Sequence, residues 1–228
     1  MKFIVANWKM NGSKEEKESM LKSLKGLKTK NKVVLCLPFT LLCGENHGIT
    51  IGAQNVSNHD NGAYTGDISA KMLKEMGAQY VIVGHSERRL YHNETNEQIK
   101  EKATMAIKNG IIPIVCVGET MEEKNAGHTI SVIKKMLLES IPDNGEFIVA
   151  YEPRWAIGSG LTPTTNEIVT AVKAVFDSLN TPMPILYGGS VTLDNARDII
   201  SIPYVDGLLI GGASLKSDTF LPIIKSID

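Results

Sequence analysis

The residues most able to do chemistry stand at the ends of short apolar runs that lie far apart in the sequence. Asn7 and Lys9 follow the first of these runs, His85 follows the fourth and Glu152 the sixth. A carboxylate can act as a general base, an imidazole can polarise a carbonyl or move protons, and an ammonium group supplies fixed positive charge. Each residue also has a structural alternative: an exposed loop glutamate, a histidine bonded only to backbone, and a solvated surface lysine.

The stretch AYEPRWAIGSGLTPT places Glu152 at the root of a predicted lid. Pro153 and Pro163 bracket the glycine-containing tip and stiffen its two ends, because proline fixes φ. The glycines leave the tip permissive and its N–H groups accessible. Apolar cover from such a lid would raise the proton affinity of Glu152, which makes this residue the best candidate base. The alternative is an ordinary surface connection.

Two glycine-rich stretches indicate a phosphate site. Gly188-Gly189-Ser190 and Gly211-Gly212 each follow an apolar run and precede a predicted helix. Adjacent glycines let the backbone approach an anion and direct N–H groups at it, in front of a helix N-terminus. The alternative is that both stretches only turn the chain.

Other polar residues are expected to be structural. We expect Glu87 to pair with Arg88 or Arg89, and Cys116 to lie in the core and not to act as a nucleophile. The remaining histidines show no metal-ligand spacing, and the three cysteines include no CxxC pair, so neither a metal site nor a disulfide is expected.

The apolar runs are strand-like and mostly lack alternation, as in parallel strands covered on both faces. They are Phe3–Ala6, Val33–Leu37, Thr50–Ala53, Tyr80–Val83, Ile112–Val117, Phe147–Tyr151, Ile185–Tyr187 and Gly207–Ile210. Strand and helix patterns alternate about eight times without a linker. The sequence therefore predicts an α/β fold, one (β/α)8 barrel with an eight-stranded parallel core over residues 1–228. A doubly wound open sheet is the alternative, although no GxGxxG follows an early strand.

Helix signals fill most of the intervals between the strands. Predicted helices run from Ser13 to about Lys28, from Thr95 to Lys108, from Ile130 to Leu138, after Thr164, after Thr192, and after a final cap at Ser217 or Asp218. The segments after Leu37 and Ala53 have weaker signals. In a parallel barrel the strand C-termini share one face, so Asn7, Lys9, His85, Glu152 and both glycine stretches should meet there.

Composition excludes several classes of protein. The 228 residues carry a formal net charge of −1 and no basic run, which argues against nucleic acid and anionic membranes as partners. The N-terminus has no long apolar region with a cleavage site, and no apolar run has membrane-spanning length. We therefore expect a cytoplasmic protein with free thiols.

Taken together, the motifs resemble those of the triosephosphate isomerase family over essentially the whole chain. The resemblance is carried by ANWKMNG, AQNVSNHDNGAYTGDIS, VIVGHSERR, CVGET, AYEPRWAIGSG, YGGSV and DGLLIGGASL, in this order. It implies a TIM barrel that interconverts dihydroxyacetone phosphate and D-glyceraldehyde 3-phosphate, in glycolysis and gluconeogenesis, through a cis-enediolate and without a cofactor.

The resemblance also implies roles for single residues. Glu152 would move the proton between carbons, neutral His85 would polarise the carbonyl, and Asn7 and Lys9 would hold the substrate oxygens. The phosphate would rest on backbone N–H groups, with apolar cover over Glu152 and a hydroxyl that latches the lid. The phosphate-binding residues would be Gly158, Ser159, Ser190, Gly211 and Gly212, the cover Ile157 and Leu209, and the latch Tyr187, with Glu87 in a supporting role.

The family is usually a homodimer, in which the loop after the third strand inserts into the partner. Here that loop is Gln54 to Ser69, and Thr65 would reach the partner's Asn7–Lys9 region.

The chain departs from the family pattern at four positions. Leu161 replaces a common lysine, Arg154 a small apolar residue, and Asp67 a glutamate whose contact to Arg88 is then in doubt. Pro163 stands where the closed lid offers a backbone N–H to the hydroxyl of Tyr187, and proline has none. We therefore expect the lid to be latched less firmly or elsewhere.

Two other functions fit parts of the sequence. A phosphate-binding barrel could form a Schiff base through Lys9, but this leaves Glu152 and its lid without a purpose. A phosphosugar-binding barrel without isomerase activity could share the fold, although such a protein would be expected to lack Glu152 or His85.

Overall fold

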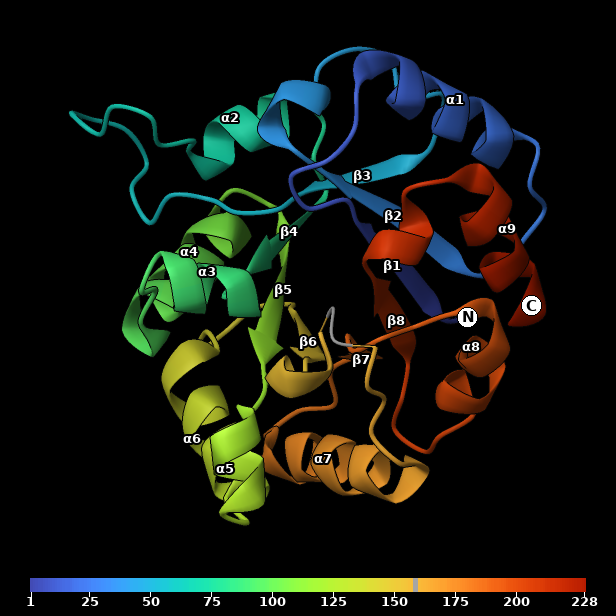
Figure 1. Ribbon diagram of the computed structural model, residues 1–228. Coiled ribbons are helices and arrows are strands. Elements are labelled where there is room, and N and C mark those ends of the chain that lie inside the picture. Colours follow the sequence, from blue (N-terminus) through green and yellow to red (C-terminus); the bar gives the residue numbers. More distant parts are fainter. Residues whose placement is uncertain (158–159) are drawn as a thin grey trace.

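The computed structural model describes residues 1–157 and 160–228, and its centre is a closed barrel of parallel strands (Figure 1). The strands of the described residues are β1 (Phe3–Asn7), β2 (Lys32–Leu37), β3 (Thr50–Ala53), β4 (Tyr80–Val83), β5 (Ile112–Val117), β6 (Ile148–Tyr151), β7 (Ile185–Tyr187) and β8 (Gly207–Ile210). Each strand pairs with its neighbours in chain order, and β8 closes the ring onto β1. The barrel prediction is confirmed, and the open-sheet alternative is wrong.

The strands read as continuous apolar runs because both of their faces are buried. Alternate residues point into the barrel, where Val5, Val34, Ile114 and Leu186 form part of a compact inner cluster. The residues between them point outward and pack against the helices in a second, larger cluster. A strand with two buried faces has no solvent side to occupy with polar residues.

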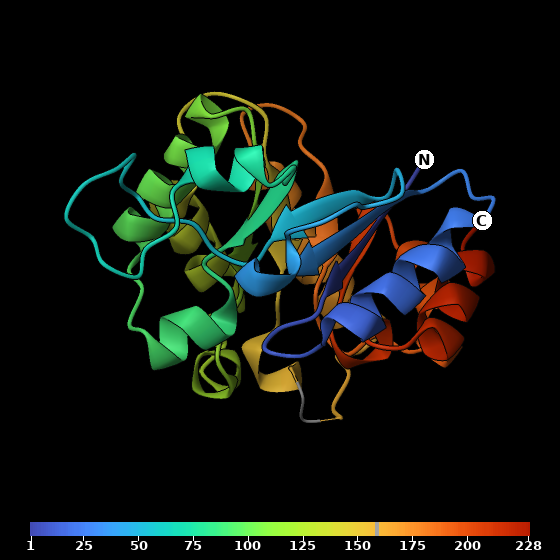
Figure 2. The ribbon, with the colours of Figure 1, turned by 90° about the horizontal axis from the view of Figure 1, so that it is seen from above.

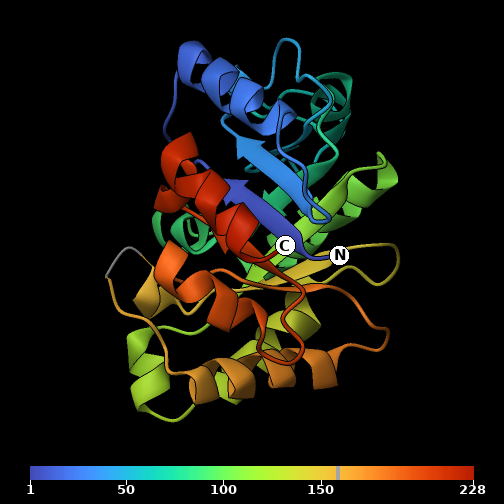
Figure 3. The same cartoon turned by 90° about the vertical axis from the view of Figure 1, so that its right-hand side faces the viewer.

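Helices surround the barrel and cover its outer face (Figures 1 and 3). They are α1 (Lys14–Lys25), α2 (Ala70–Glu75), α3 (Ser86–Tyr91), α4 (Asn96–Lys108), α5 (Met121–Asn125), α6 (Thr129–Ser140), α7 (Thr165–Ser178), α8 (Leu193–Ile200) and α9 (Ser217–Ser226). Short 3-10 turns are η1 (Phe39–Leu41), η2 (Arg154–Ala156) and η3 (Gly212–Ser214).

The predicted helix starts are largely confirmed, because capping boxes form at Ser13, Thr95, Thr164 and Thr192. Two of the differences from the expected boundaries concern the first and the last helix. The first helix ends at Lys25 and not near Lys28, since Gly26 is a poor helix former and becomes the C-cap. The last helix begins at Ser217 itself, with Lys216 in the cap position.

One long loop projects from this ring. Residues 54–69, between β3 and α2, extend away from the barrel, as the cyan and teal trace in Figures 1 and 2 shows. The two chain ends lie close together, where the side chain of Asn31 bonds to both Lys2 and Asp228. None of the described helices is both long and apolar enough to cross a membrane.

Candidate active site

A cavity of about 310 Å³ gathers the predicted site residues at the C-terminal ends of the strands. Its lining comes from the loops after β1, β4, β6, β7 and β8, which are separated by most of the chain. The predicted residues that line it are Asn7, Lys9, His85, Glu152, Ile157, Ser190, Leu209, Gly211 and Gly212. Gly158 and Ser159, which were also predicted to bind phosphate, lie outside the described residues.

Glu152 stands directly after β6 and is only 2% exposed. One carboxylate oxygen, Oε2, accepts a hydrogen bond from the backbone N–H of Ser86 at 3.1 Å. The other, Oε1, has no hydrogen-bond partner among the described residues and lies 3.3 Å from Nε2 of His85. One oxygen therefore orients the carboxylate, while the other remains available to take a proton.

His85 caps the N-terminus of α3, and its hydrogen bonds define the protonation of the ring. The backbone N–H of Glu87 donates to Nδ1 of His85 at 3.2 Å. A backbone N–H can only donate, so Nδ1 carries no proton and the neutral ring carries its proton on Nε2. His85 thus presents an N–H donor to the cavity.

Lys9 is held in place as a cation. Its Nζ lies 2.6 Å from Oε1 of Glu87, and its backbone N–H donates to Oδ1 of Asn7 at 3.1 Å. Its φ of 52° is in the left-handed region that non-glycine residues rarely adopt. The predicted pairing of Glu87 with Arg88 or Arg89 is wrong. Glu87 instead forms an ion pair with Lys9, which is 78 positions away in the sequence.

The two arginines after Glu87 have other partners. Arg88 pairs with the buried Glu94, and Nε of Arg89 donates to the backbone oxygen of Gly84 at 2.8 Å. Asp67 accepts a hydrogen bond from the hydroxyl of Ser57 at 2.6 Å instead of reaching Arg88 within the chain.

Glycines bring the backbone close to the side chains of the cavity, and at Gly188 a Cβ would be too close to Glu152. A Cβ at Gly188 would lie 2.9 Å from Cγ of Glu152, and one at Gly211 would lie 3.5 Å from Cε of Lys9. Ser190 and Gly212 line the same side of the cavity. Backbone from two loops thus lines the cavity together with Lys9, and the N–H groups of such backbone can bind an anion.

The predicted latch residue lacks a partner. Tyr187 is fully buried, and its hydroxyl makes no hydrogen bond within the described residues. Burial raises the pKa of Tyr187, and the negative charge of Glu119 raises it further. Pro163, in the loop before α7, is buried and has no backbone N–H to donate.

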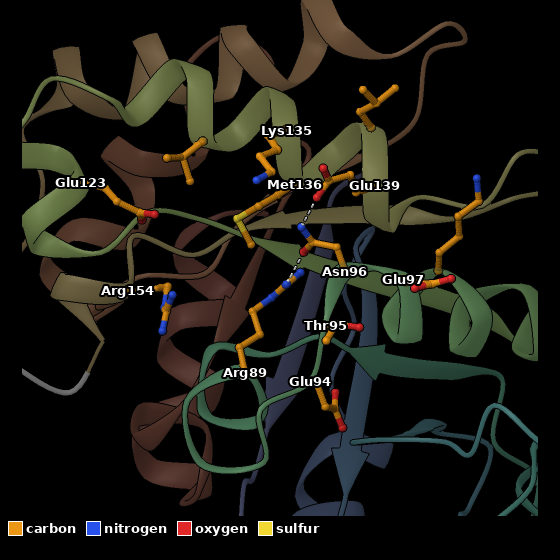
Figure 4. A pocket seen from close by; sticks show the side chains of 13 residues that line it. Arg89, Glu94, Thr95, Asn96, Glu97, Glu123, Lys135, Met136, Glu139 and Arg154 are labelled. Atoms are coloured by element: carbon orange, nitrogen blue, oxygen red, sulfur yellow. Dashed lines mark hydrogen bonds between the residues drawn. The ribbon is translucent and has the colours of Figure 1, made fainter.

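A larger cavity lies outside this site. It measures about 810 Å³ and lies beside α4 and α6, with Arg89 and Arg154 at one side (Figure 4). Its floor is structural: Arg89 donates to Asn96, which donates to Glu139, and burial lowers the pKa of Arg89 to about 10. Cations and carboxylates alternate around it, and no candidate base faces a candidate electrophile.

Sequence reasoning missed two contributors. Ser86 acts through its backbone N–H, for which side-chain type gives no signal. Glu119 follows β5 and accepts hydrogen bonds from Tyr151 at 3.2 Å and from the indole of Trp155 at 3.0 Å. The rule that polar residues after strand ends form the site could have found Glu119, because it stands two positions after Val117.

Cysteine and metal chemistry have no support in the described part of the chain. Burial raises the pKa of the Cys116 thiol, and the nearby Glu152 carboxylate adds to this effect, so the thiolate is disfavoured. Across residues 1–157 and 160–228, no three His, Cys, Asp or Glu side chains cluster as metal ligands would.

Comparisons with known proteins agree with this geometry. The family model described as triosephosphate isomerase matches residues 2–227. A triosephosphate isomerase from Wolbachia sp. subsp. Brugia malayi is 44% identical, covering 99% of this chain and 97% of the relative. One from Alkaliphilus oremlandii is 42% identical, with 97% and 98% covered. The crystal structure of triosephosphate isomerase from Bartonella henselae superposes with a TM-score of 0.87 at 37% identity, covering 99% of this chain and 98% of that one.

Proposed function

The chain belongs to the triosephosphate isomerase family, and we propose that the cavity around Glu152 is the place where it performs the family's reaction. The protein is an isomerase that interconverts dihydroxyacetone phosphate and D-glyceraldehyde 3-phosphate. What has to be assigned is the task of each residue in that cavity. The contacts of Glu152, His85 and Lys9 indicate these tasks.

Glu152 is the base. Its oxygen Oε1 is buried, has no hydrogen-bond partner among the described residues and faces the cavity. It removes the proton from the carbon next to the carbonyl and returns it to the neighbouring carbon. The bond from Ser86 to Oε2 keeps the carboxylate from rotating between the two steps. This is general base catalysis by a positioned group.

His85 is the electrophile. Because Nδ1 accepts from Glu87, the proton on Nε2 is available to a substrate oxygen. It polarises the carbonyl while Glu152 takes the carbon-bound proton, and it then passes a proton between the two oxygens of the enediolate. Lys9 and the amide of Asn7 stabilise the negative charge that develops on those oxygens.

The glycine-rich side of the cavity holds the phosphate. Backbone N–H groups of Ser190, Gly211 and Gly212, together with Gly158 and Ser159, bind its oxygens without a further cation. Ile157 and Leu209 line the cavity beside Glu152 and provide apolar cover. Lys9 as a Schiff-base nucleophile is disfavoured, because its ammonium group is paired with Glu87 at 2.6 Å.

The free oxygen of Glu152 beside Nε2 of His85 is the observation that carries the assignment. It predicts an enediolate route, in which the proton on the carboxylate can exchange with solvent. Conversion of dihydroxyacetone phosphate in deuterium oxide should therefore give D-glyceraldehyde 3-phosphate with deuterium at C2, detected by mass spectrometry. A product free of deuterium would contradict the predicted exchange of the transferred proton with solvent.

We also propose that the protein is a homodimer formed through the loop 54–69. The loop projects from the barrel, and its tip is stiffened by a stack of His59 on Tyr64, with ring centroids 3.7 Å apart. A second cavity of about 630 Å³ is lined by Asn7, Lys9 and His85, next to the 96% exposed Met10. A partner's loop around Thr65 would fill that cavity and support Lys9 from outside. The glycolytic role of the family suggests a cytoplasmic location.

A further inference from the structure

Two buried polar atoms of complementary chemistry lie near the active site without partners. They are the hydroxyl of Tyr187 and the carboxylate oxygen Oε2 of Glu119, and neither makes a hydrogen bond among the described residues. Tyr187 is 0% exposed and Glu119 is 1% exposed, so solvent does not satisfy them. A buried polar group without a partner costs free energy, and such groups are rare in native proteins. One atom is a donor and the other an acceptor, so each could satisfy the other.

Tyr151 lies next to both residues. Tyr151 and Tyr187 are register neighbours on β6 and β7, and their ring centroids are 6.4 Å apart. The hydroxyl of Tyr151 donates to Oε1 of Glu119 at 3.2 Å, which leaves Oε2 on the other side of the same carboxylate. The negative charge of Glu119 also contributes, after burial, to the raised pKa of Tyr187. The carboxylate is therefore within electrostatic range of the Tyr187 hydroxyl.

The two residues belong to different parts of the site. Glu119 holds η2, the turn that follows Glu152: its Oε1 accepts from the Trp155 indole at 3.0 Å, and its backbone oxygen accepts from Arg154 N–H at 3.0 Å. The Tyr187 hydroxyl instead lies against the glycine-rich turn at Gly189, on the side of the cavity proposed to hold the phosphate, because a Cβ at Gly189 would lie 2.2 Å from it. A bond between Glu119 and Tyr187 would join these two sides of the cavity.

We propose that Tyr187 donates to Oε2 of Glu119 in the substrate-bound enzyme, and that this bond fixes η2 against the Gly188–Ser190 turn. The inference rests on the proposed function, since occupation of that turn by phosphate is what brings the pair together. Neither side chain lines the cavity, so both are positioning residues and not catalytic ones. The pair takes the place of a backbone donor at Pro163, which the chain lacks.

The Tyr187→Phe variant tests the proposal because the unpaired hydroxyl should destabilise the free protein, whereas its hydrogen bond should stabilise the ligand-bound protein. Without ligand, the Tm of the variant should equal or exceed that of the wild type. With 2-phosphoglycolate, whose carboxylate and phosphate mimic the enediolate, affinity should fall about fivefold, the worth of one hydrogen bond. Tyr151→Phe is the matched control: it removes a bond that the free protein already makes, so its Tm should fall.

Glu119→Asp identifies the partner. The aspartate side chain is one methylene shorter, so Glu119→Asp as a single variant should weaken 2-phosphoglycolate binding. Added to Tyr187→Phe, it should cause little further loss of affinity. Additive losses, or an unchanged affinity of Tyr187→Phe, would overturn the pairing while leaving the proposed function intact. A wild type that does not bind 2-phosphoglycolate would instead overturn the proposed function, and the inference with it.

Discussion

At the scale of single residues, the position of Glu152 depends on neighbours that have no side chain. A Cβ at Gly118 would lie 1.8 Å from the backbone oxygen of Glu152, so any other residue there would displace the end of β6. Gly188 leaves room in the same way for the Glu152 side chain. The carboxylate is thus located by backbone packing and oriented by Ser86, while His85 is set by the N–H of Glu87. Most of this control comes from backbone atoms.

A buried ion cluster behind α3 predicts a pH dependence of stability. Glu94 accepts hydrogen bonds from Lys102 and Arg88. Burial raises the pKa of Glu94, but these two bonds outweigh burial and lower it below its ordinary value of 4.5. A lowered folded-state pKa means that the stabilisation is complete above the unfolded-state pKa and is lost as pH falls through the folded-state value.

Glu94→Gln should therefore lower the free energy of unfolding at about pH 7 by about 3 kcal/mol, because it leaves the buried Lys102 and the partly exposed Arg88 without their carboxylate. Urea unfolding at about pH 7 and at about pH 4 would show the gap between wild type and variant narrowing in acid. Glu97→Gln, an exposed change in the first turn of α4, is the control. A gap that does not depend on pH would contradict the argument.

At the scale of elements, the predicted lid is anchored firmly at both ends. Pro153 leads into η2, whose first N–H donates to the backbone oxygen of Glu119. Pro163 is followed at once by the capping box of α7, in which Thr164 and Glu167 satisfy each other's N–H groups. The chain between the anchors is short, and it ends at a residue that cannot donate a hydrogen bond.

The loss of that donor can be reversed. Pro163→Ala restores a backbone N–H, which the hydroxyl of Tyr187 could accept in the substrate-bound state. The affinity for 2-phosphoglycolate, measured by calorimetry, should rise by roughly 2- to 10-fold, the worth of one hydrogen bond. The gain should vanish in the double variant Pro163→Ala, Tyr187→Phe. Equal affinities of Pro163→Ala and wild type would show that residue 163 does not bond to Tyr187.

At the scale of the whole molecule, the fold was largely predictable because each strand is a continuous apolar run. Tyr80–Val83 and Ile112–Val117, for example, have the predicted boundaries. No comparable apolar pattern predicts α3 and α5, whose segments SERRLY and MEEKN are short and mostly polar. Helices of that kind depend on capping and on the strand that they follow, so a periodicity argument misses them.

The gathering of several candidate residues in one cavity was predictable from the sequence, but the contacts between them were not. The strand-end rule brought Asn7, Lys9, His85 and Glu152 into one cavity. It could not show that Glu87 pairs with Lys9, because that choice depends on how the first and fourth loops lie in space. Nor could it show that the Tyr187 hydroxyl lacks a partner, since that requires every neighbouring donor and acceptor to be placed.

The proposed dimer can be tested at the projecting loop. Thr65 is exposed at its tip, and in a dimer it would lie near the partner's cavity beside Lys9. Thr65→Arg would bring two cations together, so light scattering should show dissociation to monomers at protein concentrations where the wild type is dimeric. Thr170→Arg, an exposed change on α7, should leave the dimer intact. A monomeric wild type would contradict the dimer proposal.

The central claim, that Glu152 is the base, is tested most directly by the turnover of D-glyceraldehyde 3-phosphate in Glu152→Gln. The amide keeps the shape of the side chain but cannot take a proton, so kcat should fall at least a thousandfold, about 4 kcal/mol of barrier. Glu75→Gln, an exposed change far from the cavity, should retain wild-type turnover. Turnover by Glu152→Gln within tenfold of the wild type would show that another group moves the proton.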